Sequence, residues 1–191
     1  MTVVTDSPLA RRIEGKPRVI LTRRLLPSVE ARMAELFDAV CRTDDAPWNR
    51  AALVAAMNDC DVLLPCVTDR IDAGMLEEAG DRLKLIASFG AGTEHLDLAA
   101  ARARGIIVTN TPGVFTDDTA DMTMVLMISV CRRLREGSSL LRRGEWDGWR
   151  PSGLLGHSLS GRPLAIIGMG RIGQAVARRA RAFGLEVIYH N

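Results

Sequence analysis

Cysteine is scarce in this sequence and does not occur in metal-binding spacing. The four cysteines, Cys41, Cys60, Cys66 and Cys131, form no C-x-x-C pair and have no histidine nearby at ligand spacing. This pattern predicts neither a zinc site nor a disulfide framework. We therefore expect no bound metal, and reduced thiols of the kind found in the cytoplasm.

A strong charge imbalance and long apolar runs are also absent. The net charge is only +2, which is too small to indicate nucleic acid or a membrane surface as partner. The apolar run 122–131 is far shorter than the ~20 residues needed to span a bilayer. Residues 1–16 contain charged side chains and no apolar run, so they do not read as a secretory signal. We expect a mobile tail over 1–17 and a cytoplasmic protein.

Short β-rich runs alternate with helical segments from residue 18 onward. We expect strands at 19–22, 38–41, 62–64, 85–88 and 106–109, and helices at 29–36, 48–57, 73–79 and 96–103. This alternation predicts an α/β fold, with a parallel sheet covered by helices on both faces. Residues 18–110 have the size of a flavodoxin-like domain.

The pattern changes after this domain. Pro112 and Gly113 interrupt regular structure, and Thr116 is expected to cap a new helix whose first turn carries two acids. Because the helix is apolar almost all round, we expect it to be buried. It would lie either between domains or subunits, or at the centre of this chain's own core.

A glycine-rich motif stands near the end of the sequence. Gly168, Gly170 and Gly173 form G-x-G-x-x-G between the apolar strand 162–168 and the helix 171–183. In a dinucleotide-binding turn the first glycine makes the tight turn, the second admits a pyrophosphate, and the third lets the helix approach the strand. The motif therefore predicts dinucleotide binding, with a simple tight turn as the alternative.

The residues after the next strand, 185–189, bear on the choice of cofactor. An NAD site has an acid there to bind the ribose hydroxyls, whereas this chain has His190 and Asn191. A site without a carboxylate does not repel a 2′-phosphate, so NADPH is favoured over NADH. The alternative is that the acid lies further along.

A second glycine-rich turn, SFGAGTEHLDL, begins at Ser88. Its small residues, above all Ala91 and Gly92, leave backbone N–H groups that can face a small anion such as a carboxylate. An ordinary β–α connection is the alternative. His95 is expected to be a surface residue early in the next helix rather than an acid–base group.

Five stretches together resemble one known family. They are SFGAGTEHLDL, GIIVTNTPGVFTDDTAD, CRRLREGSSLLRRGEWDGWRP, LSGRPLAIIGMGRIGQAVARRARAFG and VIYHN. In this order and spacing the chain resembles the D-2-hydroxyacid dehydrogenase family, and most closely its glyoxylate/hydroxypyruvate reductase branch.

The resemblance implies a substrate domain over 18–110 and the first part of a Rossmann nucleotide-binding domain over 111–191. It also implies reduction of a small 2-oxo acid with NADPH or NADH, and a homodimer formed through the nucleotide-binding domain. It places Ala91 and Gly92 at the substrate carboxylate. The remaining residues carried over are Arg171 and Ile172 beneath the cofactor pyrophosphate, Thr116 on the nicotinamide side, and Trp149 in the partner subunit's substrate pocket, with a buried core tryptophan as the alternative.

The family's catalytic Arg, Glu and His lie downstream of the glycine motif, so the resemblance assigns no catalytic residue within these 191 residues. We therefore expect the chain to be the N-terminal part of such an enzyme and inactive alone, with Ile166, Ile167 and Val187 exposed. Two alternatives stay open: a corepressor-like module that senses a dinucleotide, and a formate or phosphoglycerate dehydrogenase of the same family. The segment GEWDGWRP favours the reductase branch.

Overall fold

The structure, a computed structural model, describes residues 15–191. The chain divides into two compact units, the first ending at Pro112 and the second running from Gly113 to Asn191. Most of the tail expected over 1–17 lies outside the described residues. At its described end, Lys16 Nζ donates to Glu35 O at 2.7 Å, and Pro17 O accepts from Asp38 N at 3.0 Å. Residues 16 and 17 are therefore bonded to the first unit. The roles expected for the two units stay predictions.

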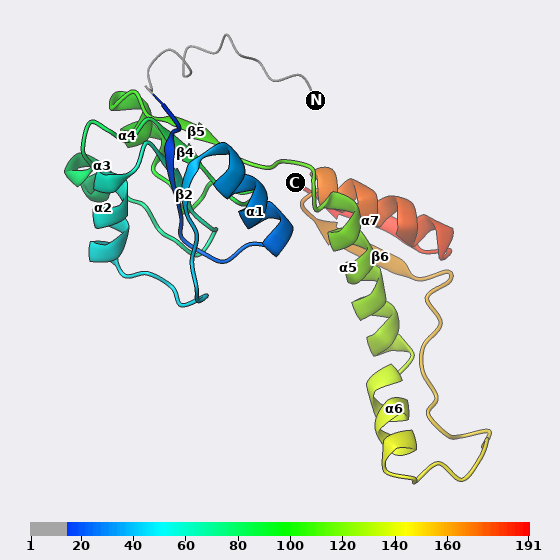
Figure 1. Cartoon of the computed structure of the whole chain (residues 1–191). Helices are drawn as coiled ribbons and strands as arrows, with labels where there is room; N and C mark the ends of the chain where they lie inside the picture. Colours follow the sequence, from blue (N-terminus) through cyan, green and yellow to red (C-terminus); the bar gives the residue numbers. More distant parts are fainter. Residues whose placement is uncertain (1–14) are drawn as a thin grey trace. The chain divides into compact units, whose positions relative to one another are not determined.

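The first unit contains a five-stranded parallel sheet in the order β2-β1-β3-β4-β5 (Figure 1). The strands are β1 Arg18–Leu21, β2 Asp38–Val40, β3 Val62–Leu64, β4 Leu85–Ala87 and β5 Ile107–Thr109. This is the strand order of flavodoxin-like folds. The predicted α/β fold class is confirmed.

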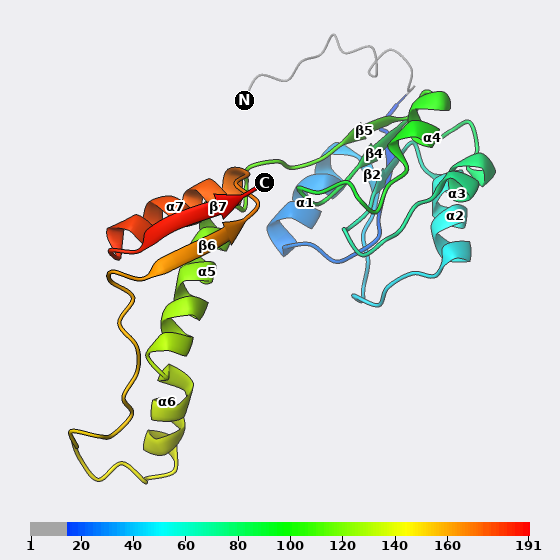
Figure 2. The ribbon, with the colours of Figure 1, turned by 180° about the vertical axis from the view of Figure 1, so that it is seen from behind.

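Four helices connect these strands: α1 Pro27–Leu36, α2 Arg50–Asp59, α3 Ala73–Glu78 and α4 Leu98–Ala103. Helix α1 lies on one face of the sheet and the other three lie on the opposite face (Figures 1 and 2). The cores of the two faces differ, because α2, α3 and α4 all contribute buried side chains, such as Met57 and Leu76, whereas α1 contributes none. The main core of the unit therefore lies under α2–α4.

The second unit contains α5 Thr116–Cys131, α6 Leu134–Arg142, β6 Pro163–Ile167, α7 Arg171–Ala182 and β7 Glu186–His190. Strands β6 and β7 pair in parallel, with α7 as their crossover, which is the first βαβ step of a Rossmann fold. Helix α5 packs on α7 through Ala120, Met124 and Val176. Arg179 of α7 joins the two helices, with Nη2 at 3.1 Å from Asp117 and Nε at 2.5 Å from Asp121.

Helix α5 differs from its prediction in two ways. Phe115 occupies the N-cap without a side-chain cap, and Thr116 is already the first helical residue. Ala120 and Met124 are the buried residues of α5, whereas Leu126 is 60% and Val130 is 78% exposed. Helix α7 covers only part of the apolar surface of α5, so α5 is not the central core helix of the second unit that the structure describes. No helix in the described residues is long and apolar enough to cross a membrane.

The exposed apolar sheet surface is smaller than expected. Ile167 is 89% exposed, as predicted, but Ile166 and Val187 pack partly against the core formed with α5 and α7. The helix on that face covers them, which the strand pattern alone does not show.

Candidate functional site

The turn of SFGAG follows β4 in the first unit and is held at both ends. Ser88 N donates to Thr109 O at 2.8 Å, and Phe89 N donates to Pro65 O at 2.8 Å. On the far side, Thr111 N donates to Gly90 O at 2.9 Å, and Asn110 Nδ2 donates to Ala91 O at 2.8 Å. The carbonyl groups of the turn are thus satisfied by the segment that follows β5.

Two N–H groups of this turn, in contrast to its carbonyl groups, have no hydrogen-bond partner in the described chain. Neither Ala91 N nor Gly92 N donates a hydrogen bond to another residue of the described chain. Ala91 is exposed and Gly92 is half-buried, so both donors lie near solvent. The carboxyl group of Glu94 lies against Gly92, closer than 3.0 Å to the place a Cβ would take. Because this is the end of a flexible side chain, it can move aside.

His95 lies in a turn before α4, and it is half-buried rather than on the surface of the helix. Its Nε2 is 3.1 Å from Oγ of the buried Ser88. Burial lowers the pKa of His95, and the smaller effects of Glu94 and Asp69 raise it. The expectation of a surface helical residue is therefore wrong, because the chain between Ser88 and His95 folds back on itself.

Each of the three glycines of the second turn lies in a different local environment. Gly168 has φ +94°, which strains any L side chain. A Cβ on Gly173 would lie closer than 3.0 Å to the carbonyl oxygen of Gly168, so α7 can approach the turn only because this residue has no side chain. Gly170 is the N-cap of α7, and a Cβ there would meet no atom within 4 Å. Its surroundings are open to a ligand.

The last residue of β7, His190, and the residue that follows it, Asn191, contact this turn. Gly168 N donates to His190 O at 2.7 Å, and Met169 N donates to Asn191 Oδ1 at 2.6 Å. Gln174 Nε2 donates to Met169 O at 3.1 Å. The structure thus brings His190 and Asn191 to the glycine turn, with the Asn191 amide engaged by the backbone and the His190 side chain exposed.

The other predicted site residues lie in different surroundings. Arg171 and Ile172 begin α7 and are exposed, and Thr116 is half-buried at the start of α5. Trp149 lies in the loop after α6 and is 80% exposed. The alternative of a buried core tryptophan is wrong for this chain, because no described segment covers the loop.

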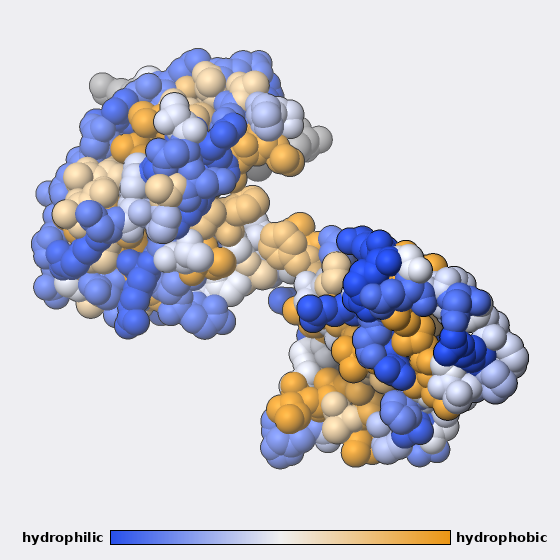
Figure 3. All heavy atoms as spheres, turned by 90° about the horizontal axis from the view of Figure 1, so that it is seen from below, coloured by the Kyte–Doolittle hydropathy of each residue, from blue (hydrophilic) through white to orange (hydrophobic). Residues whose placement is uncertain are grey.

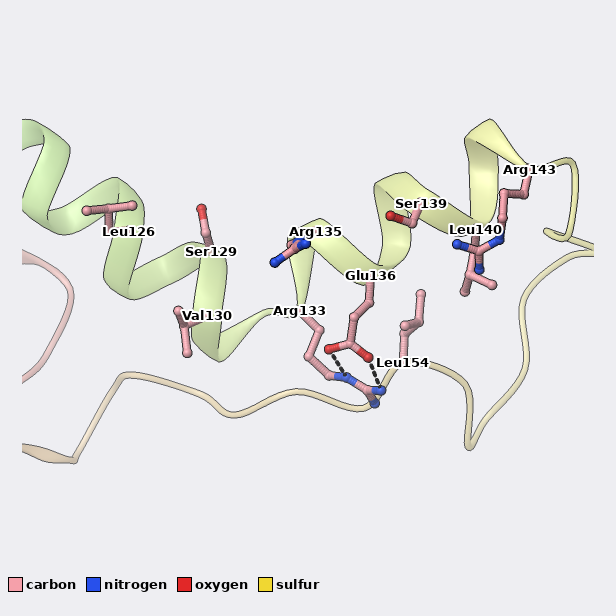
Figure 4. Close-up of a pocket in the computed structure, with 10 residues that line it drawn as sticks. All are labelled: Leu126, Ser129, Val130, Arg133, Arg135, Glu136, Ser139, Leu140, Arg143 and Leu154. Carbon is pink, nitrogen blue, oxygen red and sulfur yellow. Dashed lines mark hydrogen bonds and ion pairs between the residues drawn. The ribbon is translucent and has the colours of Figure 1, made fainter.

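A larger hollow of the second unit lies elsewhere. It measures about 820 Å³ and is lined by the C-terminal part of α5, by α6 along most of its length and by Leu154, with Arg133 and Glu136 paired at 2.5 Å in its wall (Figure 4). None of the predicted site residues lines it. A smaller hollow of about 410 Å³ borders the glycine turn at Gly168, Ile172 and Gly173.

Sequence reasoning missed one polar cluster in the first unit. Asp69 is buried beside Thr22 and Arg23, where β1 and β3 end. Arg23 follows β1 by two residues and Asp69 follows β3 by five, so the sequence does not mark them as partners, although the ends of neighbouring parallel strands meet at one edge of the sheet.

Comparison with known proteins identifies the family. A family model described as D-isomer specific 2-hydroxyacid dehydrogenase, catalytic domain, matches residues 19–187. The chain is 42% identical over 180 residues to a glyoxylate reductase of Thermococcus litoralis, and the match covers 92% of this chain and 54% of that relative. A glyoxylate reductase of Korarchaeum cryptofilum is 40% identical over 177 residues, 92% of this chain and 53% of that protein. The chain thus spans about half the length of the curated relatives it matches.

A solved structure supports the same assignment. An NADPH-dependent glyoxylate/hydroxypyruvate reductase from Sinorhizobium meliloti, in complex with citrate, is 34% identical with a TM-score of 0.76. The match covers 92% of this chain and 54% of that one. As its sequence stretches predict, the chain belongs to the D-isomer specific 2-hydroxyacid dehydrogenase family.

Proposed function

We propose that this chain supplies the substrate-carboxylate turn and the first part of the cofactor site of a glyoxylate or hydroxypyruvate reductase. The observation that carries the proposal is the pair of adjacent N–H groups at Ala91 and Gly92, which donate to no described residue. The names of the relatives, glyoxylate reductases among them, support this substrate class.

The carboxylate turn is suited to a small 2-oxo acid. Two neighbouring N–H groups can donate to the oxygens of one carboxylate, and such charge-assisted hydrogen bonds are roughly twice as strong as neutral ones. The bonds from Asn110 and Thr111 hold the carbonyl groups of the turn in place. The turn therefore binds and orients the acid end of the substrate, and its specificity is for the carboxylate rather than for the rest of the molecule.

The second turn is suited to a dinucleotide. The space beside Gly170 is open, and a Cβ at this residue would occupy part of it. The N–H groups of the first turn of α7, which begins at Arg171, lie next to this space, and helix N-termini favour phosphate groups. When bound, the nicotinamide cofactor supplies the hydride. In this proposal Gly168, Gly170 and Gly173 shape the turn, Arg171 and Ile172 lie beneath the pyrophosphate, and Thr116 lies on the nicotinamide side.

We propose NADPH as the preferred cofactor. The end of β7 carries His190 and Asn191 and no acid, so no carboxylate at these positions opposes a 2′-phosphate. The Asn191 side-chain oxygen accepts a hydrogen bond from Met169 N. The exposed His190 side chain is accordingly the group that we assign to the ribose side.

A homodimer formed through the second unit completes the proposal. Its support is the apolar surface of α5, where Met122, Val125, Leu126 and Val130 are all more than half exposed. Apolar surface is visible on this unit in Figure 3. We place the exposed Trp149 at the substrate pocket of the partner subunit, and the whole protein in the cytoplasm.

We propose that the chain alone is inactive, because the resemblance assigns none of the family's catalytic residues, Arg, Glu and His, to these 191 residues. A corepressor-like module is the less favoured reading, since the relatives named above are reductases. Formate and phosphoglycerate dehydrogenase activities are less favoured for the same reason.

The test is substrate selectivity in a family-length protein that carries these residues as its N-terminal part. NADPH oxidation should be faster with glyoxylate or hydroxypyruvate than with phosphohydroxypyruvate, and formate should give no reduction of NAD. A protein that binds NADPH but turns over none of these acids would overturn the proposal in favour of a binding module.

A further inference from the structure

A buried ion pair lies where β1 and β3 end. The Asp69 side chain is 1% exposed and the Arg23 side chain 12%, with Asp69 Oδ1 at 2.9 Å from Arg23 Nη2. Oδ1 accepts no hydrogen bond in the described chain, so the two side chains attract each other mainly through their opposite charges. Oδ2 accepts from Thr22 Oγ1 and, at 2.9 Å, from Cys66 N.

The presence of a buried ion pair is not explained by a gain in folding stability. Removing two charges from water carries a large desolvation cost, and replacing a buried pair by apolar residues is often neutral for stability. The pair also lies at a particular place, because β1 and β3 are the neighbours at which the strand order of the sheet reverses. In open α/β sheets, ligands bind beside the carboxyl ends of the strands at this point.

The Asp69 carboxylate holds the loop 65–69 that follows β3. Cys66 N donates to Asp69 Oδ2, and Asp69 N donates in return to Cys66 O at 2.9 Å. Arg23 Nη2 also donates to Thr68 Oγ1 at 2.9 Å. The pair thus fastens this loop both at its first residues and near its end.

The same loop supports the carboxylate turn. Pro65 O accepts from Phe89 N at 2.8 Å, and Cys66 and Phe89 form a parallel bridge. A Cβ on Gly90 would lie closer than 3.0 Å to Val67 Cγ1. Val67 therefore packs directly on the backbone of Gly90, the residue that precedes the two free N–H groups.

We propose that Asp69 and Arg23 are positioning residues for substrate. They fix the loop 65–69, and through Val67 they hold the turn from Gly90 to Gly92 in the geometry that binds a 2-oxo acid carboxylate. This inference rests on the carboxylate site of the proposed function and deepens it.

The experiment is a titration of the ¹⁵N-labelled chain with oxalate, followed through the amide signals of Ala91 and Gly92. Asp69→Asn keeps the shape of the side chain and removes its charge, and Arg23→Gln removes the opposite charge. Each should weaken oxalate binding about tenfold, which is about 1.4 kcal/mol. Arg23→Lys, which retains the charge, should recover part of the affinity.

Two matched controls separate positioning from stability. Glu78→Gln removes the exposed pair with Arg50 at 2.7 Å in the same unit, and should leave oxalate affinity unchanged. Leu53→Ala opens a cavity in the core under α2 and lowers the unfolding temperature. At a temperature where it is folded, it should also bind oxalate normally.

The outcomes are distinct. If oxalate does not move the Ala91 and Gly92 signals of the unaltered chain, the proposed carboxylate site fails and this inference fails with it. If the unaltered chain binds and Asp69→Asn and Arg23→Gln bind equally well, only the positioning role is overturned. The same holds if Leu53→Ala weakens binding as much as they do. Should Asp69→Asn not fold, Arg23→Gln and Val67→Ala, at a residue that is 54% exposed, decide the question.

Discussion

Gly173 and Gly170 are expected to separate the two tasks of the glycine motif, which are to fold the second unit and to admit a cofactor. Both residues can be changed to alanine, and neither has a positive φ. The Cβ of Gly173→Ala would lie closer than 3.0 Å to the carbonyl oxygen of Gly168 and 3.2 Å from its carbonyl carbon. The Cβ of Gly170→Ala would meet no atom within 4 Å.

The magnitudes follow from these contacts. Alanine is favoured over glycine inside a helix by about 1 kcal/mol, which partly offsets the cost at Gly173. Overpacking costs about 1–3 kcal/mol, and it is at the upper end here because the obstacle is backbone rather than a flexible side chain. The net loss should be about 1–2 kcal/mol, and each kcal/mol lowers the unfolding temperature of a unit of this size by about 4–8 °C. At Gly170 the loss of a favourable N-cap residue costs about 0.5–1 kcal/mol, which is less than the loss at Gly173.

The assay combines thermal unfolding of the second unit with NADPH binding. Gly173→Ala should unfold at a lower temperature, whereas Gly170→Ala should unfold close to the unaltered chain and bind NADPH more weakly in the family-length protein. If Gly173→Ala is as stable as the unaltered chain, the close approach of α7 to the turn is not as described. If Gly170→Ala binds NADPH normally, the pyrophosphate does not lie at this turn.

Three further outcomes are expected. His190→Asp should shift the ratio of kcat/KM with NADPH to that with NADH toward NADH, because an added carboxylate repels a 2′-phosphate; an NADH preference in the unaltered enzyme would refute this. Burial raises the pKa of Asp61, yet hydrogen bonds from Arg82 and from the N–H of Arg18 outweigh it and leave the pKa below its ordinary 3.8. The ionised Asp61 therefore contributes to the free energy of unfolding above about pH 4, and this contribution is lost as the pH falls through the lowered pKa. In Asp61→Asn, the free energy of unfolding measured with urea should depend less on pH below about pH 4. The 191-residue chain should not oxidise NADPH with glyoxylate above a heat-treated blank, and turnover by it would place a proton donor within these residues.

The sequence predicted the sheet well because its strands are signalled locally. The five β-rich runs of the first unit all became strands, within one residue at each end, since β-branched residues bounded by polar turns carry their own pattern. The glycine turns were equally visible, because Gly168 meets a conformational requirement that few other residues can satisfy.

The predictions that failed depend on groups far apart in the sequence. The apolar pattern of α5 indicates that it needs cover, but it does not say that α7 covers only one side, at Ala120 and Met124. Similarly, nothing near Asp69 in the sequence shows that Arg23, on another strand's end, will approach it to 2.9 Å. His95 was misplaced because its partner Ser88 is reached only when the turn closes.

Gly92→Val tests whether the turn at Ala91 and Gly92 binds the substrate carboxylate. The three atoms nearest to a new Cβ all belong to the flexible end of Glu94, so the variant should fold, while the bulk of valine narrows the approach to the two N–H groups. In the family-length protein, we expect the KM for glyoxylate to rise about tenfold or more, which corresponds to a loss of at least about 1.4 kcal/mol of binding free energy. The KM for NADPH should be unchanged. An equal rise in both KM values, or no change in either, would contradict this role of the turn.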